Sequence, residues 1–202
     1  MNGTVCEVSV QVRWSHLADM MYVGYGSNLD PKDWTRYCSS HGVDPAGLKA
    51  VTPVLILDHR LTFNHRSGRW DGGAANITFS PDDAVPAMAF DIDDERIWDV
   101  LDAKEGVSET PEKSVYERCE VLILLPDGNV ELATTYRVTQ RLLDKRAARG
   151  APRHVEPSEA YLEAVIRGLT HHGLPTGHLA PAAADKTCPP FEHVFVYGTL
   201  LA

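Results

Sequence analysis

Apolar and polar residues alternate along several short runs of this chain, with the two-residue period of a half-buried strand. Such runs cover residues 21–25, 54–64, 74–80 and 84–92. The turn sequence SPDD separates the last two runs, so we expect a hairpin there, and the polar stretch RSGRWDGG at 66–73 is expected to be a loop. Two further runs flank PDGN at 126–129, which is the strongest hairpin signal in the chain.

Three segments between and after these strands have helical features. Asp30 followed by Pro31 is an N-cap with a first-turn proline, which predicts a short helix over DPKDWTRYC. In the segment 93–106 apolar residues share one face at helical spacing, with a candidate N-cap at its first residue and a glycine stop at its last. Ser158 begins an amphipathic helix that ends near residues 173–175.

The order of these elements predicts the fold class. At least five strands follow one another mostly through hairpins, with helices between or after them. We therefore expect an α+β fold whose mostly antiparallel sheet is closed into a small β-barrel with flanking helices. Residues 21–179 are expected to form this domain. Residues 1–20 are expected to be an N-terminal extension, either non-native or a real extra strand, because Met20 and Met21 stand directly before the first strand.

Composition narrows the partners and the compartment. Nineteen basic and 28 acidic residues give a net charge of -9, which disfavours nucleic acid or an anionic membrane as a partner and fits a small-molecule ligand better. No long apolar segment and no secretory signal pattern is present. The four cysteines form no C-x-x-C pair, so we expect free thiols in a cytoplasmic protein.

Two short motifs carry candidate chemistry. In MYVGYGSNLD, Gly26 allows a sharp turn after the strand, and such a turn can gather several N–H groups into a hollow that binds a carboxylate or an oxyanion. In LDAKEGV, Glu105 is expected at the C-terminal end of a helix, where the helix dipole and apolar neighbours raise the pKa of a carboxyl group. An ordinary strand-to-helix turn and a solvated surface glutamate are the alternative interpretations of these two motifs.

Taken together, the motifs resemble the gamma-glutamylcyclotransferases. The resemblance covers about residues 21–175 and is carried by YGSNL, WDGGAANITFS, LDAKEGV, the following Tyr116, TYRV, PSEAYLEAVIRG and GLP, in this order and at similar spacing. It implies an antiparallel barrel with the active site at one mouth. It also implies an enzyme that releases 5-oxoproline and a free amino acid or amine from a gamma-glutamyl compound, because the substrate's own amine attacks its gamma-carbonyl. No protein nucleophile, cofactor or metal is expected.

The resemblance also implies roles for particular residues. Glu105 would be the general base and then the general acid. The substrate-binding residues would be Tyr25, Gly26, Ser27, Asn28, Leu29, Tyr116 and Tyr161. The two last tyrosines could equally be core residues. Because the histidines lack the spacing and acidic companions of a metal site, we expect no metal.

Other interpretations remain open. Residues 180–202 are expected to be a linker and the possible first strand of a second domain, because FVYGTLL near 193–201 is similar to the opening of another branch of the same superfamily. A second domain or a homodimer is therefore possible. The alternative function is a non-catalytic member that binds a gamma-glutamyl or acyl ligand.

Overall fold

The computed structural model describes residues 21–186, so the expected extension at 1–20 and the family-like segment at 193–201 lie outside the described residues. Five strands form its sheet: β1 (Met21–Gly24), β2 (Leu48–Ser67), β3 (Gly72–Ile92), β4 (Tyr116–Leu124) and β5 (Val130–Val138). The helices are α1 (Pro31–Ser40), α2 (Arg96–Glu105), α3 (Gln140–Ala148), α4 (Glu159–His171) and α5 (Leu179–Ala183). Short 3-10 turns lie at η2 (Ser27–Leu29), η3 (Pro45–Gly47) and η4 (Pro111–Lys113).

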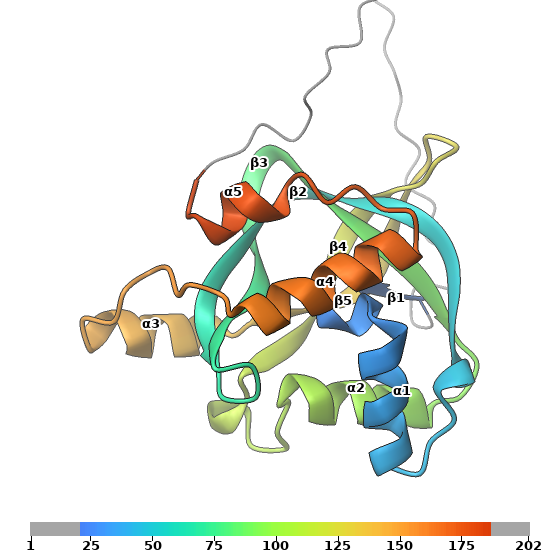
Figure 1. Ribbon diagram of the computed structural model, residues 1–202, viewed down its shortest axis with the longest axis horizontal. Coiled ribbons are helices and arrows are strands. Elements are labelled where there is room, and N and C mark those ends of the chain that lie inside the picture. Colours follow the sequence, from blue (N-terminus) through green and yellow to red (C-terminus); the bar gives the residue numbers. More distant parts are fainter. Residues whose placement is uncertain (1–20, 187–202) are drawn as a thin grey trace, which may run out of the picture.

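The five strands close into a barrel in the order β1-β3-β2-β4-β5 (Figure 1). Four of the five strand pairings are antiparallel. The barrel is closed by a short parallel contact between β1 and β5, where Tyr22 pairs with Thr134. The expected α+β fold with a small, mostly antiparallel barrel is confirmed. The hairpin expected at PDGN is also confirmed, because β4 and β5 pair along their whole length on either side of it.

The hairpin expected at SPDD is wrong. Residues 72–92 form one continuous strand that pairs with β2 both before and after this sequence. Leu57 pairs with Ala84 and His59 with Phe79, so four residues of β3 face the single Asp58 of β2 as a bulge. Asp58 and Asp82 both have positive φ, 54° and 66°, and the Asp82 N–H donates to Asp58 Oδ1 at 3.1 Å. The real hairpin joins β2 to β3 at residues 68–71.

The helix ends lie at the capping residues predicted from the sequence, with one exception. Asp30 accepts from the Lys32 N–H at 3.1 Å, Ser158 caps α4 by accepting from Tyr161, and Gly106 ends α2 at φ 67°. The candidate cap at Asp93 is wrong, because its N–H is bonded to Gly47 O at 3.0 Å and the helix begins only at residue 96.

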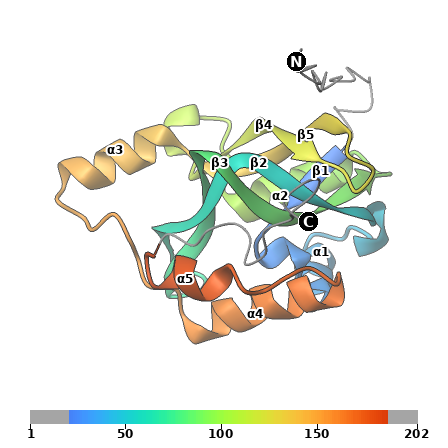
Figure 2. The same ribbon diagram turned by 90° about the horizontal axis from the view of Figure 1, so that it is seen from above.

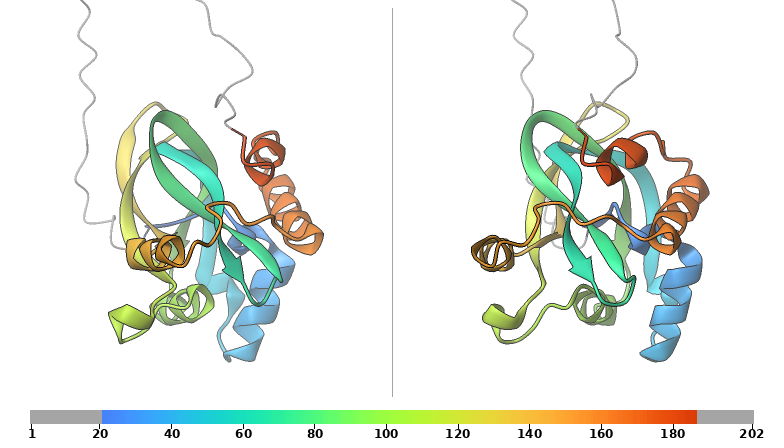
Figure 3. Two further views of the ribbon diagram at one scale, coloured as in Figure 1. Left: turned by 90° about the vertical axis from the view of Figure 1, so that its left-hand side faces the viewer. Right: turned by 60° about the vertical axis from the view of Figure 1, so that its left-hand side comes forward.

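Two helices were not expected from the sequence. None of the residues of α3 is buried, and α3 projects from the barrel on the side away from α1 (Figure 2). Helix α5 occupies the beginning of the segment with linker composition, and its Leu179 is buried against the rest of the domain. Together α4 and α5 cover one side of the barrel, whereas α3 lies on the other (Figure 3).

Glycines at the start of β3 let the chain before α4 cross the barrel closely. The Gly73 N–H donates to Glu156 O at 2.8 Å, and a Cβ on Gly73 would lie 2.0 Å from Val155 O. A Cβ on Gly72 would lie 2.4 Å from the Ser158 N. The two glycines are therefore needed for close backbone approach. This crossing fixes α4 beside the tip of the β2–β3 hairpin.

Candidate active site

A cavity of about 250 Å³ lies where the end of β1, η2, the tip of the β2–β3 hairpin, the end of α2, β4 and α4 meet. Of the residues expected from the sequence to form the site, all but one line this cavity: Tyr25, Gly26, Ser27, Asn28, Glu105, Tyr116 and Tyr161. The exception is Leu29, which is 1% exposed and packs beneath α4. The fold thus brings together motifs that are more than 70 residues apart in the sequence.

Glu105 is the last residue of α2 and reaches the η2 turn. Its Oε1 accepts a hydrogen bond of 2.8 Å from Asn28 Nδ2, a contact that spans 77 positions of sequence. Burial raises the pKa of the Glu105 carboxyl, while nearby Lys104, the bond from Asn28 and Arg69 act in the opposite direction. A carboxyl group in this setting can exchange a proton nearer neutral pH than an exposed glutamate can.

The η2 turn presents backbone N–H groups at one end of the cavity. Its internal bonds are donated by the N–H groups of Leu29 to Gly26 O and of Asp30 to Ser27 O, at 3.1 and 3.2 Å. The 3-10 turn does not pair the earlier N–H groups of residues 26–28, as is usual at the start of a helical turn. A Cβ at Gly26 would lie 3.3 Å from the Tyr161 hydroxyl oxygen, which is a tight contact.

Helix α4 packs directly on this turn through a glycine. A Cβ on Gly168 would lie 2.5 Å from Leu29 Cβ and 2.7 Å from the Asp30 N. The Arg167 guanidinium binds Asp30 Oδ2 at 2.9 Å from the same helix. The turn is therefore held from behind by α4.

Five tyrosines line the cavity, and Tyr136 OH donates to Asp102 Oδ1 at 2.6 Å. The hydroxyls of the other four are also bonded to the protein. Tyr161 OH accepts from the Ala75 N–H at 3.0 Å, and Tyr116 OH donates to Ala75 O at 2.8 Å. Tyr25 OH donates to Tyr136 O at 2.6 Å, and Tyr22 OH accepts from Asn28 Nδ2 at 2.7 Å. Burial raises the pKa of all four, so they are neutral phenols.

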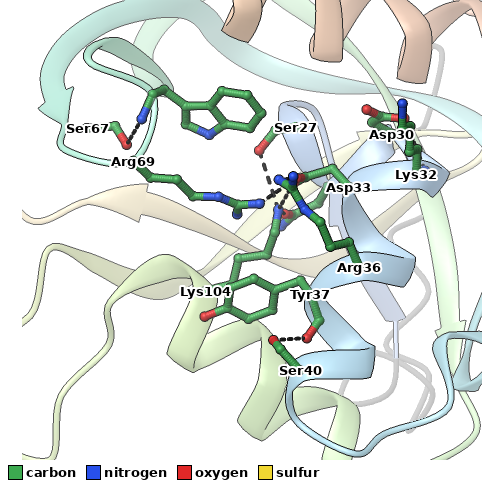
Figure 4. A network of polar contacts seen from close by, with 12 residues as sticks. Ser27, Asp30, Lys32, Asp33, Arg36, Tyr37, Ser40, Ser67, Arg69 and Lys104 are labelled. Carbon is green, nitrogen blue, oxygen red and sulfur yellow. Dashed lines mark hydrogen bonds and ion pairs between the residues drawn. The ribbon is translucent and has the colours of Figure 1, made fainter.

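Sequence reasoning missed a charged cluster beside Glu105, drawn in Figure 4. Asp33 of α1, 3% exposed, receives Arg69 from the hairpin tip, Arg36 at 3.1 Å and Lys104 at 3.1 Å (Figure 4). The Arg69 guanidinium also lies over the rings of Tyr37 and Trp70, 5.3 and 5.2 Å from their centroids. Only the position of Lys104 next to Glu105 could have indicated this cluster, because its other members come from distant elements.

Another missed residue is His65 of β2, which lines the cavity against the Tyr116 ring. Its Nδ1 is buried, and no hydrogen-bond partner for it lies among residues 21–186. Burial and, secondarily, Arg146 lower the pKa of this imidazole. The imidazole is therefore neutral near pH 7, and its Nδ1 is a buried atom without a partner among the described residues.

Among residues 21–186, no group of three His, Cys, Asp or Glu side chains is placed to hold a metal ion. No helix in this part of the protein combines the length and apolar character required to cross a membrane.

Comparisons with known proteins agree with the fold. A model of the AIG2-like family matches residues 85–180. A solved structure of gamma-glutamyl cyclotransferase has a TM-score of 0.60 at 22% identity, covering 90% of this chain and 95% of that one, and the human protein loc79017 gives the same values. YkqA from Bacillus subtilis has a TM-score of 0.63 at 19% identity, covering 83% of this chain and 55% of its own. A comparison with curated proteins gave no match.

The family model and the barrel agree with the resemblance carried by the sequence motifs. The matched residues include all of α2 with Glu105, β4 with Tyr116 and α4 with Tyr161, which line the cavity, but not β1 or the η2 turn. These comparisons support the gamma-glutamylcyclotransferase/AIG2-like superfamily that the sequence motifs resemble.

Proposed function

We propose that this protein is a gamma-glutamylcyclotransferase-type enzyme, which releases 5-oxoproline and a free amino acid or amine from a gamma-glutamyl compound. The observation that carries the proposal is the position of Glu105, whose carboxyl lies 2.8 Å from Asn28 in the cavity formed by the η2 turn. A proton-exchanging carboxyl and an array of backbone donors are the two features that intramolecular ring closure requires.

The reaction needs proton transfer rather than a protein nucleophile. The substrate's alpha-amine enters as an ammonium ion, gives one proton to the Glu105 carboxylate and attacks the gamma-carbonyl carbon. Glu105 then passes this proton to the leaving nitrogen, the bond from the gamma-carbon to that nitrogen breaks, and the amine departs. The ring nitrogen still carries one extra proton, which it gives to the Glu105 carboxylate and which leaves on the released amine. The products are therefore the neutral lactam and an ammonium ion, and no water is consumed. The pKa of Glu105, raised chiefly by burial, favours both directions of this transfer.

The N–H groups of residues 26–28 are suited to the negative charge that develops on the gamma-carbonyl oxygen. They start a turn whose other N–H groups are already bonded, and α4 supports it from behind. Preorganised backbone donors of this kind stabilise an oxyanion without rearrangement. Their role does not depend on the Ser27 hydroxyl, so Ser27→Ala should retain most of the activity.

The cavity wall explains how a flexible substrate could be held bent. A volume of about 250 Å³ suits a small, folded substrate, and tyrosine rings with fixed hydroxyls contribute to the wall. Holding the amine against the carbonyl supplies most of the rate advantage of an intramolecular reaction.

Mass spectrometry for 5-oxoproline after incubation with a panel of gamma-glutamyl peptides and amines tests the proposal. We expect the native protein to release 5-oxoproline from at least one compound, and Glu105→Gln to lower kcat by at least about 100-fold because the proton carrier is lost. Glu109→Gln, at an exposed position four residues further on, is the matched control.

Two results would contradict the proposal. Unchanged release by Glu105→Gln would remove the mechanism. If the native protein binds members of the panel but converts none of them, the protein is a binding module instead.

A further inference from the structure

The side chain of Lys104 has an unusual environment for a lysine next to a proposed proton carrier. It is 3% exposed, and its Nζ lies 3.1 Å from Asp33 Oδ2 and 3.4 Å from Ser27 Oγ and also donates to Asn28 Oδ1. An ammonium group has three N–H donors, and here it faces three acceptors. The Lys104 ammonium thus makes its close contacts within the protein, although its side chain lines the cavity.

The hydrogen bonds of Asn28 connect Lys104 to Glu105. Asn28 is 7% exposed, and its amide oxygen faces the Lys104 ammonium, which can only donate. Its two N–H groups consequently point the other way, to Tyr22 OH at 2.7 Å and to Glu105 Oε1 at 2.8 Å. A flipped amide would direct its N–H groups at the ammonium and its oxygen at the carboxylate. The two neighbouring residues of α2 thus fix the amide from both sides.

Asp33 in turn holds Lys104 in place from α1. Its carboxylate is buried and also binds Arg69 and Arg36, so three cationic groups meet at one anion (Figure 4). The Lys104 ammonium is thus held by Asp33 on one side and by the η2 turn on the other. The Lys104 ammonium should therefore stay in place when a substrate binds, and the electrostatic effect of its charge on Glu105 should not change.

We propose that Lys104 is a positioning residue, which orients the Asn28 amide and thereby holds the Glu105 carboxylate in position for proton transfer. This inference rests on the proposed role of Glu105. In this role Lys104 is anchored by Asp33. Neither the fold nor the ring-closing reaction by itself requires such a role of residue 104.

The charged and titratable groups around Glu105 determine how a substitution of Lys104 would change the pKa of Glu105. The charged groups are Lys104, Arg69 and Asp102. Burial raises the pKa of Glu105, and the charge of Lys104 opposes this rise more than the other two groups affect it. The charge of Glu105 helps to raise the pKa of nearby tyrosines, which are therefore neutral phenols. They are Tyr22, Tyr25, Tyr37, Tyr116 and Tyr161. Removing the ammonium should therefore raise the pKa of Glu105 further.

Two variants separate the charge of Lys104 from its hydrogen bonds. Lys104→Met removes both at similar length, whereas Lys104→Gln removes the charge and keeps an amide donor for Asn28 Oδ1. Lys145→Met, at an exposed lysine of α3, is the matched control. The first measurement is the carboxyl titration of Glu105 by 13C NMR in the ligand-free protein, assigned by comparison with Glu105→Gln.

We expect the titration midpoint of Glu105 to rise by about one pH unit in both Lys104 variants and to stay unchanged in the control. At a pH above the midpoint, Lys104→Met should lower kcat about tenfold, because the Asn28 amide is no longer fixed, whereas Lys104→Gln should stay within about threefold of the native protein. A midpoint that does not rise, or equal losses of kcat in the two variants, would overturn the inference.

The two proposals can fail separately. If the native protein releases no 5-oxoproline, the proposed function fails, but the titration of the ligand-free protein still shows whether Lys104 controls Glu105. Should Lys104→Met not fold, as judged by circular dichroism, Lys104→Gln decides by itself: a midpoint that does not rise in this variant contradicts the inference.

Discussion

The side chain of Glu105 is held by the backbone and side chains of elements far from it in sequence. The adjacent Gly106, at φ 67°, ends α2 so that the chain turns away and the carboxyl remains at the cavity. The motifs in the sequence were sufficient to predict Glu105 and the η2 turn, because each is a local pattern. They could not predict Asp33 or Arg69, whose positions beside Lys104 depend on how α1 and the hairpin tip pack.

The pH dependence of activity follows from the raised pKa of Glu105. A general base must be deprotonated in the free enzyme, so kcat/KM should increase with pH through this pKa. Because burial raises it, the midpoint of the acid limb should lie above the ordinary glutamate value of 4.5. Rates measured from pH 4 to 8, with a substrate whose own groups do not titrate at the midpoint, provide the check. An acid limb at or below 4.5 would contradict the assignment.

Among the elements, α4 and the η2 turn are joined by a close glycine contact. The sequence predicted α4 from its serine cap and apolar face, but it gave no indication that Gly168 is the contact point. The error at SPDD also arose at this scale. Ser, Pro and Asp allow both a tight turn and a bulge with positive φ, and only the pairing of β2 along both halves of β3 distinguishes them.

Gly168→Ala should destabilise the protein and reduce activity together. The new methyl group would lie 2.5 Å from Leu29 Cβ, so α4 or the turn must move. Overpacking of this kind costs about 1–3 kcal/mol. Thermal or urea unfolding measures the loss, and 5-oxoproline release reports the displacement of the turn. Gly177→Ala is the control, since its Cβ would meet nothing within 4 Å. Equal stability of the two variants would show that the contact is not tight.

For the molecule as a whole, the barrel is what turns separated motifs into one site. Local patterns predicted most strands and the hairpin at PDGN, yet the closing pair of Tyr22 and Thr134 joins parallel strands that no turn connects. This closure positions β1, and with it the η2 turn, opposite the end of α2. Long-range pairing of this kind is decided by burial across the whole core, which short windows of sequence do not contain.

Ligand binding should stabilise the whole domain, because the cavity joins so many of its elements. In Glu105→Gln, which should bind substrate without converting it, a gamma-glutamyl compound at 100 times its Kd should add about 2.7 kcal/mol to the free energy of unfolding. Thermal unfolding with increasing ligand measures this effect. The matching alpha-glutamyl compound should give a smaller shift. Equal shifts for the two compounds would contradict a site built for a gamma-glutamyl group.

The most direct test of ring closure is product analysis by mass spectrometry in 18O-labelled water, with the native protein and a gamma-glutamyl substrate. Intramolecular attack by the amine predicts 5-oxoproline that contains no 18O, formed in equal amount to the released amine. Glutamate carrying one 18O atom would show that water, and not the substrate's own amine, attacks the carbonyl, and would contradict the account.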